Sequence, residues 1–114
     1  VSGNAAIGAV TAFGAGPSRG GGVFVDGSSS LTVRNTTVAA NRIESGGPAE
    51  GGGLFVEAGG TATVGSTVLA ANVAGPGGVD ASGAVVSLGA NLVGDGTGAT
   101  PGQPGAVRLF GFAD

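Results

Sequence analysis

Two acidic residues, Asp26 and Glu57, could support chemistry because they occupy the same place in two copies of a 31-residue repeat. If the copies stack, the two carboxylates lie one coil apart at the end of a strand. Such a pair could bind Ca²⁺, or raise the pKa of one carboxyl group for acid–base work. No Arg and no further acid falls in the same register. We therefore prefer a solvated strand end, with a metal site at Asp26 and Glu57 as the alternative.

Two aromatic residues, Phe24 and Phe55, also occupy equivalent places in the two copies, and each stands between apolar residues that we expect to point inward. Alternation along a strand turns both rings to the opposite face. Stacked surface rings can bind sugar rings, so Phe24 and Phe55 are candidate glycan-binding residues. The interpretation that we prefer is that a neighbouring loop covers them.

Four asparagines recur at one place in successive repeats. Asn tolerates the left-handed backbone of a chain corner, and stacked amide groups can hydrogen-bond to one another. We therefore predict a structural ladder and not a ligand site. Its members are Asn4, Asn41, Asn72 and Asn91.

No residue pattern indicates catalysis or a cofactor. The 114 residues include no His and no Cys, which removes the commonest general base, thiol nucleophiles and zinc thiolate sites. A net charge of −3, with only four basic residues, provides no basic stripe for nucleic acid. The charge-free runs are too rich in Gly, Ser and Thr to cross a bilayer. Neither nucleic acid nor membrane insertion by this segment is expected.

The elements that must position these residues are repeats. Residues 20–41 and 51–72 align without a gap, so that Val23 should pair with Leu54 and Arg19 with Glu50. We expect coils over 1–95, with a partial copy at 1–19, full copies at 20–50 and 51–80, and a shortened copy at 81–95 that skips one strand. Residues 96–114 form a Gly/Pro-rich tail, in which 107–112 is a candidate capping strand.

Apolar residues in each copy alternate at spacing two between clusters of Gly, which is the strand period and not the helical one. Each repeat therefore holds about three short strands. Such a unit cannot bury an apolar face alone, so the copies must stack with equivalent strands paired in parallel. The sequence predicts an all-β fold, a right-handed single-stranded parallel β-helix (solenoid) of about three coils, each the length of one repeat. The hand follows that of parallel crossovers in general.

The repeat phrases resemble those of a known group of proteins. GGGVF and GGGLF, each followed by VAAN or LAAN, are similar to the GGA[I/L/V] and FxxN pair of chlamydial polymorphic outer-membrane proteins. They resemble more closely the GGGIY…STVSGN repeats of bacterial secreted right-handed parallel β-helix proteins. SLGANLVGD at 87–95 is similar to the SLGxNLIG phrase that often ends such arrays. The chain differs in having Val38 and Leu69 where FxxN has Phe.

The resemblance implies a bacterial extracellular or cell-surface location, associated with the outer membrane. It implies a structural or adhesive segment, as in an autotransporter passenger, and we expect no enzyme. The alternative is a fragment of a polysaccharide-active lyase or hydrolase, which would need two positioned carboxylates. Expected partners are a surface glycan, a host or neighbouring cell surface, and further coils of the same chain, because Val1 opens in mid-repeat. Open coil ends should also self-associate.

Overall fold

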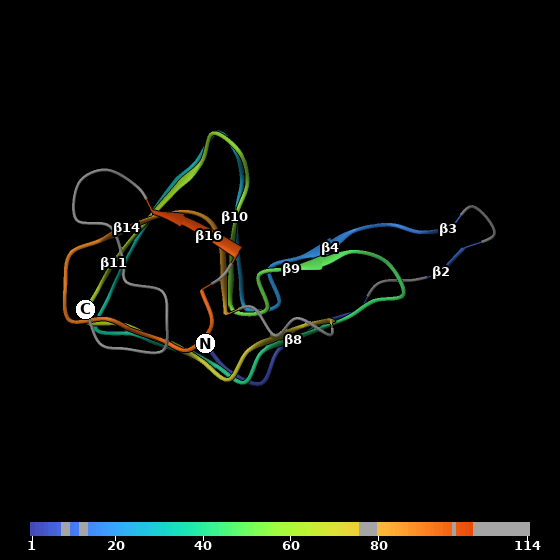
Figure 1. The fold of residues 1–114 in the computed structure, drawn as a ribbon, viewed down its shortest axis with the longest axis horizontal. Coiled ribbons are helices and arrows are strands. Elements are labelled where there is room, and N and C mark those ends of the chain that lie inside the picture. The colour runs from blue at the N-terminus through green and yellow to red at the C-terminus, as the bar shows by residue number, and fades with distance from the viewer. Residues whose placement is uncertain (8–9, 12–13, 76–79, 97, 102–114) are drawn as a thin grey trace.

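A computed structural model describes residues 1–7, 10–11, 14–75, 80–96 and 98–101. Over these ranges the fold is all-β, with strands that are mostly parallel and no α-helix (Figure 1). The expectations of an all-β fold and of no α-helix are therefore confirmed for this part of the chain. Within it, no helix has the length and apolar character needed to cross a membrane.

The largest sheet has six strands and joins the repeats in two rows. In the first row, β5 (Val23–Val25) pairs in parallel with β10 (Leu54–Val56). In the second row, β6 (Ser30–Arg34) pairs in parallel with β11 (Thr61–Gly65). Both rows continue onto one long strand, β14 (Ala81–Ser87), which makes the sheet curl.

Two three-stranded parallel sheets complete the stack. One contains β7 (Thr37–Ala39), β12 (Val68–Ala70) and β15 (Leu92–Val93), with β12 in the middle. The other contains β1 (Ala5–Ile7), β8 (Arg42–Glu44) and β13 (Val73–Ala74), with β8 in the middle. In Figure 1 the chain segments of successive repeats overlie one another, as these pairings require.

The pairing register between the two full copies agrees with the constant offset of the repeat in the sequence. Val23 lies opposite Leu54, Val33 opposite Val64, and Val38 opposite Leu69. The preceding partial copy has a longer offset, with Ala5 opposite Arg42. These expected pairings are confirmed.

The shortened copy differs from its expected form, because a turn is missing and not a strand. Leu54 pairs with Ala81, and Ala62 pairs with Val85. Ala81 and Val85 in the shortened copy are therefore closer together along the chain than their partners Leu54 and Ala62 in the full copy. The two short strands of a full copy correspond to the single strand β14 in the shortened copy. The chain bends at Gly83, whose φ is 96°. A Cβ there would overlap the carbonyl oxygen of Val56, so only glycine fits.

Alternation of side chains along the strands builds a narrow aliphatic core. Inward apolar residues of the paired strands fill it. The core is made of small and medium side chains, as a coil of this width requires. Its buried members are Val25, Val38, Leu54, Val56, Ala62, Val64, Leu69, Ala81, Val85 and Val93.

The second half of the partial copy leaves the stack. Its strands β2 (Val10–Thr11) and β3 (Gly14–Ala15) pair antiparallel, and they project from the body at the right of Figure 1. The chain returns through β4 (Ser18–Arg19), which pairs in parallel with β9 (Ala49–Glu50).

The tail proposed at 96–114 contains a strand that sequence reasoning did not foresee. β16 (Gly98–Pro101) pairs in parallel with β14, with Ser82 opposite Gly98. The candidate capping strand at 107–112 lies outside the described residues.

Replacement of Leu69 by Ala tests the stacked core. Leu69 is fully buried between Val38 and Val93 of the adjacent coils, so we expect a loss of about 2–5 kcal/mol in the free energy of unfolding. The matched control is Leu92→Ala, an exposed leucine of β15, which should change stability by less than about 0.5 kcal/mol. Urea denaturation measures both, and equal losses would contradict this assignment of the core.

Candidate functional site

The asparagine ladder is a continuous row of amide groups that begins at the exposed Asn4 and is buried at Asn41 and Asn72. Asn4 Nδ2 donates to Asn41 Oδ1 at 2.9 Å, and Asn41 Nδ2 donates to Asn72 Oδ1 at 2.9 Å. The same oxygens also accept the backbone N–H of Asn4 and of Asn41. Asn41 and Asn72 are buried, so the row satisfies polar groups that would otherwise lack partners.

The row ends on Asp80, a buried residue that sequence reasoning missed. Asp80 Oδ1 accepts both the side-chain and the backbone N–H of Asn72, each at 2.7 Å, and Oδ2 accepts the N–H of Asp95 at 2.8 Å. A carboxylate suits this place because it only accepts hydrogen bonds. The available signal was an acidic residue directly before an apolar strand.

The glycine triplets at 20–22 and 51–53 leave the space that the amide row needs. A Cβ at Gly22 would lie 2.8 Å from Asn41 Nδ2, and a Cβ at Gly53 would lie 2.6 Å from Asn72 Nδ2. The third glycine of each triplet therefore makes room for an amide group. In the shortened copy Asp80 occupies the place of this glycine, because Leu54 pairs with Ala81.

Asn91 does not belong to the row. Its Oδ1 accepts the N–H of Thr67, and its Nδ2 donates to Val64 O and to Ser87 Oγ. The cause is the register of β15, in which Leu92 lies opposite Val68. Alignment of the SLGAN phrase with the VLAAN phrase would instead have placed Asn91 beside Asn72, so this member of the predicted ladder was wrong.

At the corners that carry Asn41, Asn72 and Asn91, the left-handed residue is also not the asparagine. Ala40, Ala71 and Ala90, which precede Asn41, Asn72 and Asn91, have φ values of 55°, 57° and 58°. The asparagine side chain is thereby turned inward, where its amide enters the row or bonds to a strand. Asn is present at these corners because its side-chain amide both donates and accepts hydrogen bonds, and not because Asn tolerates positive φ.

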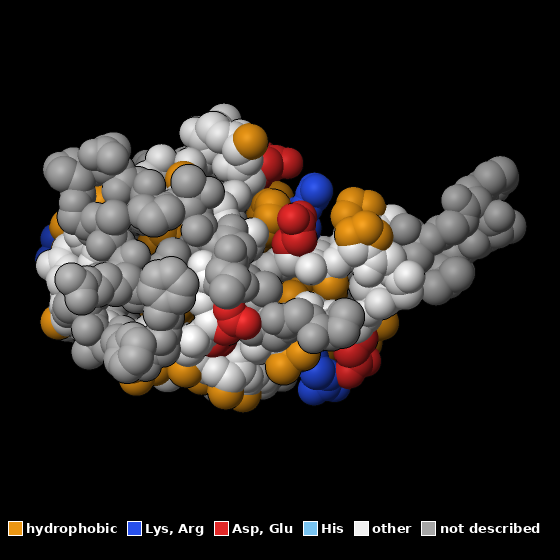
Figure 2. Space-filling view, viewed as in Figure 1, with side chains coloured by type: hydrophobic (Ala, Val, Ile, Leu, Met, Phe, Trp, Pro, Cys, Tyr) orange, Lys and Arg blue, Asp and Glu red, His pale blue; other side chains and the backbone are white. Residues whose placement is uncertain are grey.

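Phe24 and Phe55 form a stacked pair, with ring centroids 5.6 Å apart and an interplanar angle of 18°. Phe55 is buried at 7% exposure, whereas Phe24 is 49% exposed. The guanidinium of Arg19 lies 5.2 Å from the Phe55 centroid and forms an ion pair with Glu50, with Nε and Oε2 3.0 Å apart. Figure 2 shows basic and acidic groups beside hydrophobic side chains above β4 and β9. We call Arg19, Phe24, Glu50 and Phe55 the aromatic patch.

Asp26 and Glu57 are engaged by the turn that follows β5. Asp26 Oδ1 accepts the N–H and the hydroxyl of Ser28 at 2.8 and 2.6 Å, and Glu57 Oε2 accepts the N–H of Gly27 at 3.1 Å. The hydrogen bonds from Ser28 hold the pKa of Asp26 below its ordinary value. Among the described residues, no group of three or more His, Cys, Asp or Glu is placed to hold a metal ion. The two carboxylates stabilise a turn.

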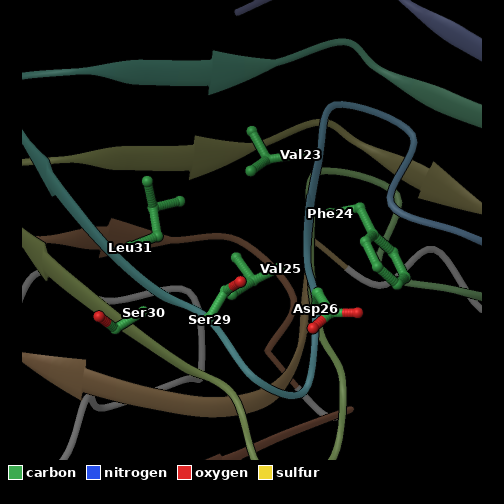
Figure 3. A pocket seen from close by; sticks show the side chains of 7 residues that line it. All are labelled: Val23, Phe24, Val25, Asp26, Ser29, Ser30 and Leu31. Carbon is green, nitrogen blue, oxygen red and sulfur yellow. The ribbon is translucent and has the colours of Figure 1, made fainter.

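A pocket opens between β5 and β6, and sequence reasoning gave no signal for it. Figure 3 shows Val23, Val25 and Leu31 pointing into the space between the two strands, whereas the ring of Phe24 points to the other side of β5. Asp26, Ser29 and Ser30 form its rim. The pocket is therefore the open mouth of the aliphatic core. Phe24 of the aromatic patch also lines it, although its ring is turned to the other side of β5.

Substitution of Asn41 tests the amide row. Asn41→Leu removes the groups that bond Asn4, Asn72 and Val1 O, so we expect a loss of about 2–3 kcal/mol from unsatisfied buried polar groups. Asn4→Leu is the matched control at the exposed end of the row and should cost less than about 1 kcal/mol. Thermal and urea unfolding measure the difference, and unchanged melting of Asn41→Leu would contradict the structural role.

Substitution of Ser28 tests the origin of the low pKa of Asp26. Ser28→Ala removes the hydroxyl donor, so the pKa of Asp26 should rise toward its ordinary value, as read by NMR titration of the side-chain carboxyl. Because the folded-state pKa is lowered, the contribution of Asp26 to stability is present above the ordinary carboxyl pKa and is lost as the pH falls through the folded value. A Ser29→Ala control should leave the titration unchanged, and an unchanged pKa in Ser28→Ala would contradict this cause.

Comparison of this chain with protein-family models, with characterised proteins and with solved structures found no match. The geometry of the stacked repeats is therefore the basis on which a function can be proposed. That geometry commits most of the candidate residues to hydrogen bonds within the fold and leaves Arg19, Phe24 and Glu50 of the aromatic patch exposed.

Proposed function

We propose that this chain is a segment of a right-handed single-stranded parallel β-helix that acts as a scaffold in an extracellular, cell-surface protein of a bacterium. The observation that carries the proposal is the register between the full copies, in which strands, aromatic rings and amide groups all repeat with the same offset along the chain. A chain that returns to the same place after each coil builds a rod with regularly spaced side chains. The right hand follows the preference of parallel crossovers.

A scaffold role agrees with how the polar groups are used. Asp26 and Glu57 accept hydrogen bonds within a turn, and the amide row ends on the carboxylate of Asp80. These carboxylates support the fold and so argue against the second hypothesis, a polysaccharide lyase or hydrolase. A chain without Cys and with few charges is also suited to an extracellular rod that needs neither disulfides nor metal.

The aromatic patch favours an adhesive function as a second candidate. Phe24 is half exposed, and Phe55 supports its ring from one side, while Arg19 lies over Phe55. A ring held rigidly in this way can stack on the apolar face of a sugar, and the ion pair of Arg19 with Glu50 supplies donors and acceptors for hydroxyl groups. We propose a surface glycan as its partner.

A glycan array tests the adhesive function. The unmodified chain should bind a subset of glycans saturably, and Phe24→Ala should lose this binding, since it removes the exposed ring and spares the buried Phe55. The matched control is Leu88→Ala, which removes another exposed apolar side chain, 47% exposed against 49% for Phe24. Equal binding by all three proteins, or binding by none, would reject the patch as a glycan site.

Incubation of the unmodified chain with polysaccharides tests the scaffold role against the enzymatic alternative. We expect no new reducing ends and no unsaturated products when the chain is incubated with acidic and neutral polysaccharides, with or without Ca²⁺. Product formation that is lost in an Asp26→Asn/Glu57→Gln variant would overturn the scaffold proposal in favour of a lyase or hydrolase.

A further inference from the structure

A triplet of residues, Asn35-Thr36-Thr37, lies where the chain turns from β6 into β7. Asn, followed by any residue except Pro and then by Ser or Thr, is the acceptor sequence for N-linked glycans. The triplet occurs only once in the chain. Neither the scaffold nor the aromatic patch uses it, and sequence reasoning did not identify it because Asn35 lies outside the recurring corner motif.

Asn35 differs from the other asparagines in the state of its amide group. Asn4, Asn41, Asn72 and Asn91 all use their side chains in hydrogen bonds within the fold. The side chain of Asn35 is exposed, and it makes no hydrogen bond to any residue that the structure describes. Its amide group is therefore accessible to a partner and is not needed to hold the described fold together.

The two threonines of the triplet have different surroundings. Thr36 Oγ1 donates to Arg34 O at 2.8 Å, as Thr67 Oγ1 donates to Gly65 O in the next repeat, so this hydroxyl stabilises the turn. Thr37 begins β7 and is exposed on the face opposite the buried Val38. The amide group and the hydroxyl that define the acceptor are thus both open to solvent.

The exposure of this corner does not depend on which repeats lie beside it. β12 pairs with both β7 and β15, so the residues that precede these three strands share one corner. They are Asn35, Ser66 and Ala90, with φ values of 51°, 50° and 58°. Ser66 has a paired repeat on either side and is still exposed. Side chains at this corner therefore project sideways from the stack, and a repeat lying over β6 and β7 would leave Asn35 accessible.

We propose that Asn35 is the acceptor of an N-linked glycan, transferred by a separate glycosyltransferase from a phosphate-activated sugar donor. The bond between C1 of the sugar and Nδ2 of Asn35 forms, and the bond between C1 and the phosphate oxygen of the donor breaks. The phosphate group leaves with the electron pair, and Nδ2 gives up one proton to the transferase. Nothing is oxidised or reduced. A nucleotide sugar and a lipid-linked oligosaccharide are the two donors that share this chemistry.

The fold accommodates such a modification. The glycan would extend from a corner that lies away from the aliphatic core and from the amide row, and the aromatic patch is carried by the other strands β4, β5, β9 and β10. Only 10% of the residues in the chain are charged, and a covalent glycan adds bulky, well-solvated surface. The inference goes beyond the proposed scaffold and adhesive functions and does not rest on either.

Enzymatic glycosylation of the folded chain tests the proposal. One arm uses a soluble asparagine glycosyltransferase with a nucleotide hexose, and the other uses a membrane oligosaccharyltransferase with a lipid-linked glycan. The intact mass should rise by one glycan in at least one arm, which identifies the donor, and peptide mapping should place the glycan on Asn35. Asn35→Gln and Thr37→Ala should each abolish the increase. Thr36→Ala is the matched control and should keep it, because the middle residue of the triplet is not read. No increase in either arm, or an increase that persists in Asn35→Gln, would overturn the proposal.

Two relocated triplets separate the corner geometry from the sequence alone. Val93→Thr, a change of similar shape, completes the same triplet after Asn91, whose buried amide bonds to Val64 O and Ser87 Oγ. The folded variant should gain no second glycan, whereas a short peptide of the same sequence should be modified. Ser66→Asn/Val68→Thr moves the triplet to the equivalent exposed corner and should gain a second glycan. Modification of Asn91 in the folded chain, or none at the relocated corner triplet, would refute the role of this corner.

Discussion

The parallel pairing of each repeat with the next is the interaction on which this structure depends. A repeat contributes only a few inward aliphatic side chains, such as Leu54, Val56 and Leu69, and cannot bury them without neighbours. The ladder of backbone hydrogen bonds holds the coils together but does not itself choose the register. A slip of one residue would turn every inward side chain outward, so the register must be specified by side chains.

Side chains specify the register at three places around the coil. The amide groups of Asn41 and Asn72 meet only in register, and the glycine triplets leave the space that these amides need. Phe24 stacks on Phe55, and Arg19 pairs with Glu50. The buried amides contribute most, since leaving one unpaired costs more than losing an exposed ion pair. The residues that specify the pairing register and stabilise the fold are therefore ones that, in the sequence alone, resemble functional-site residues.

The shortened copy shows how the pattern ends. Loss of one turn joins two rows into β14 and brings Asp80 to the end of the amide row. A carboxylate there accepts from Asn72 without presenting a donor that would need a further coil. The backbone of Asp80 also accepts from Gly53 and Leu54, so the same residue completes both the side-chain row and the strand pairing.

The sequence by itself determined the repeat, the strand period and the pairing of the two full copies, because periodicity and the identity of aligned residues are local properties of the chain. It also indicated the stacking of Phe24 on Phe55. Only the tertiary structure decided which residues complete each row. Asn91 matches the corner motif but lies beside Thr67, since its place depends on the length of every turn before it. Asp80 and β16 gave no periodic signal, and their roles arise from contacts with residues far away in the sequence.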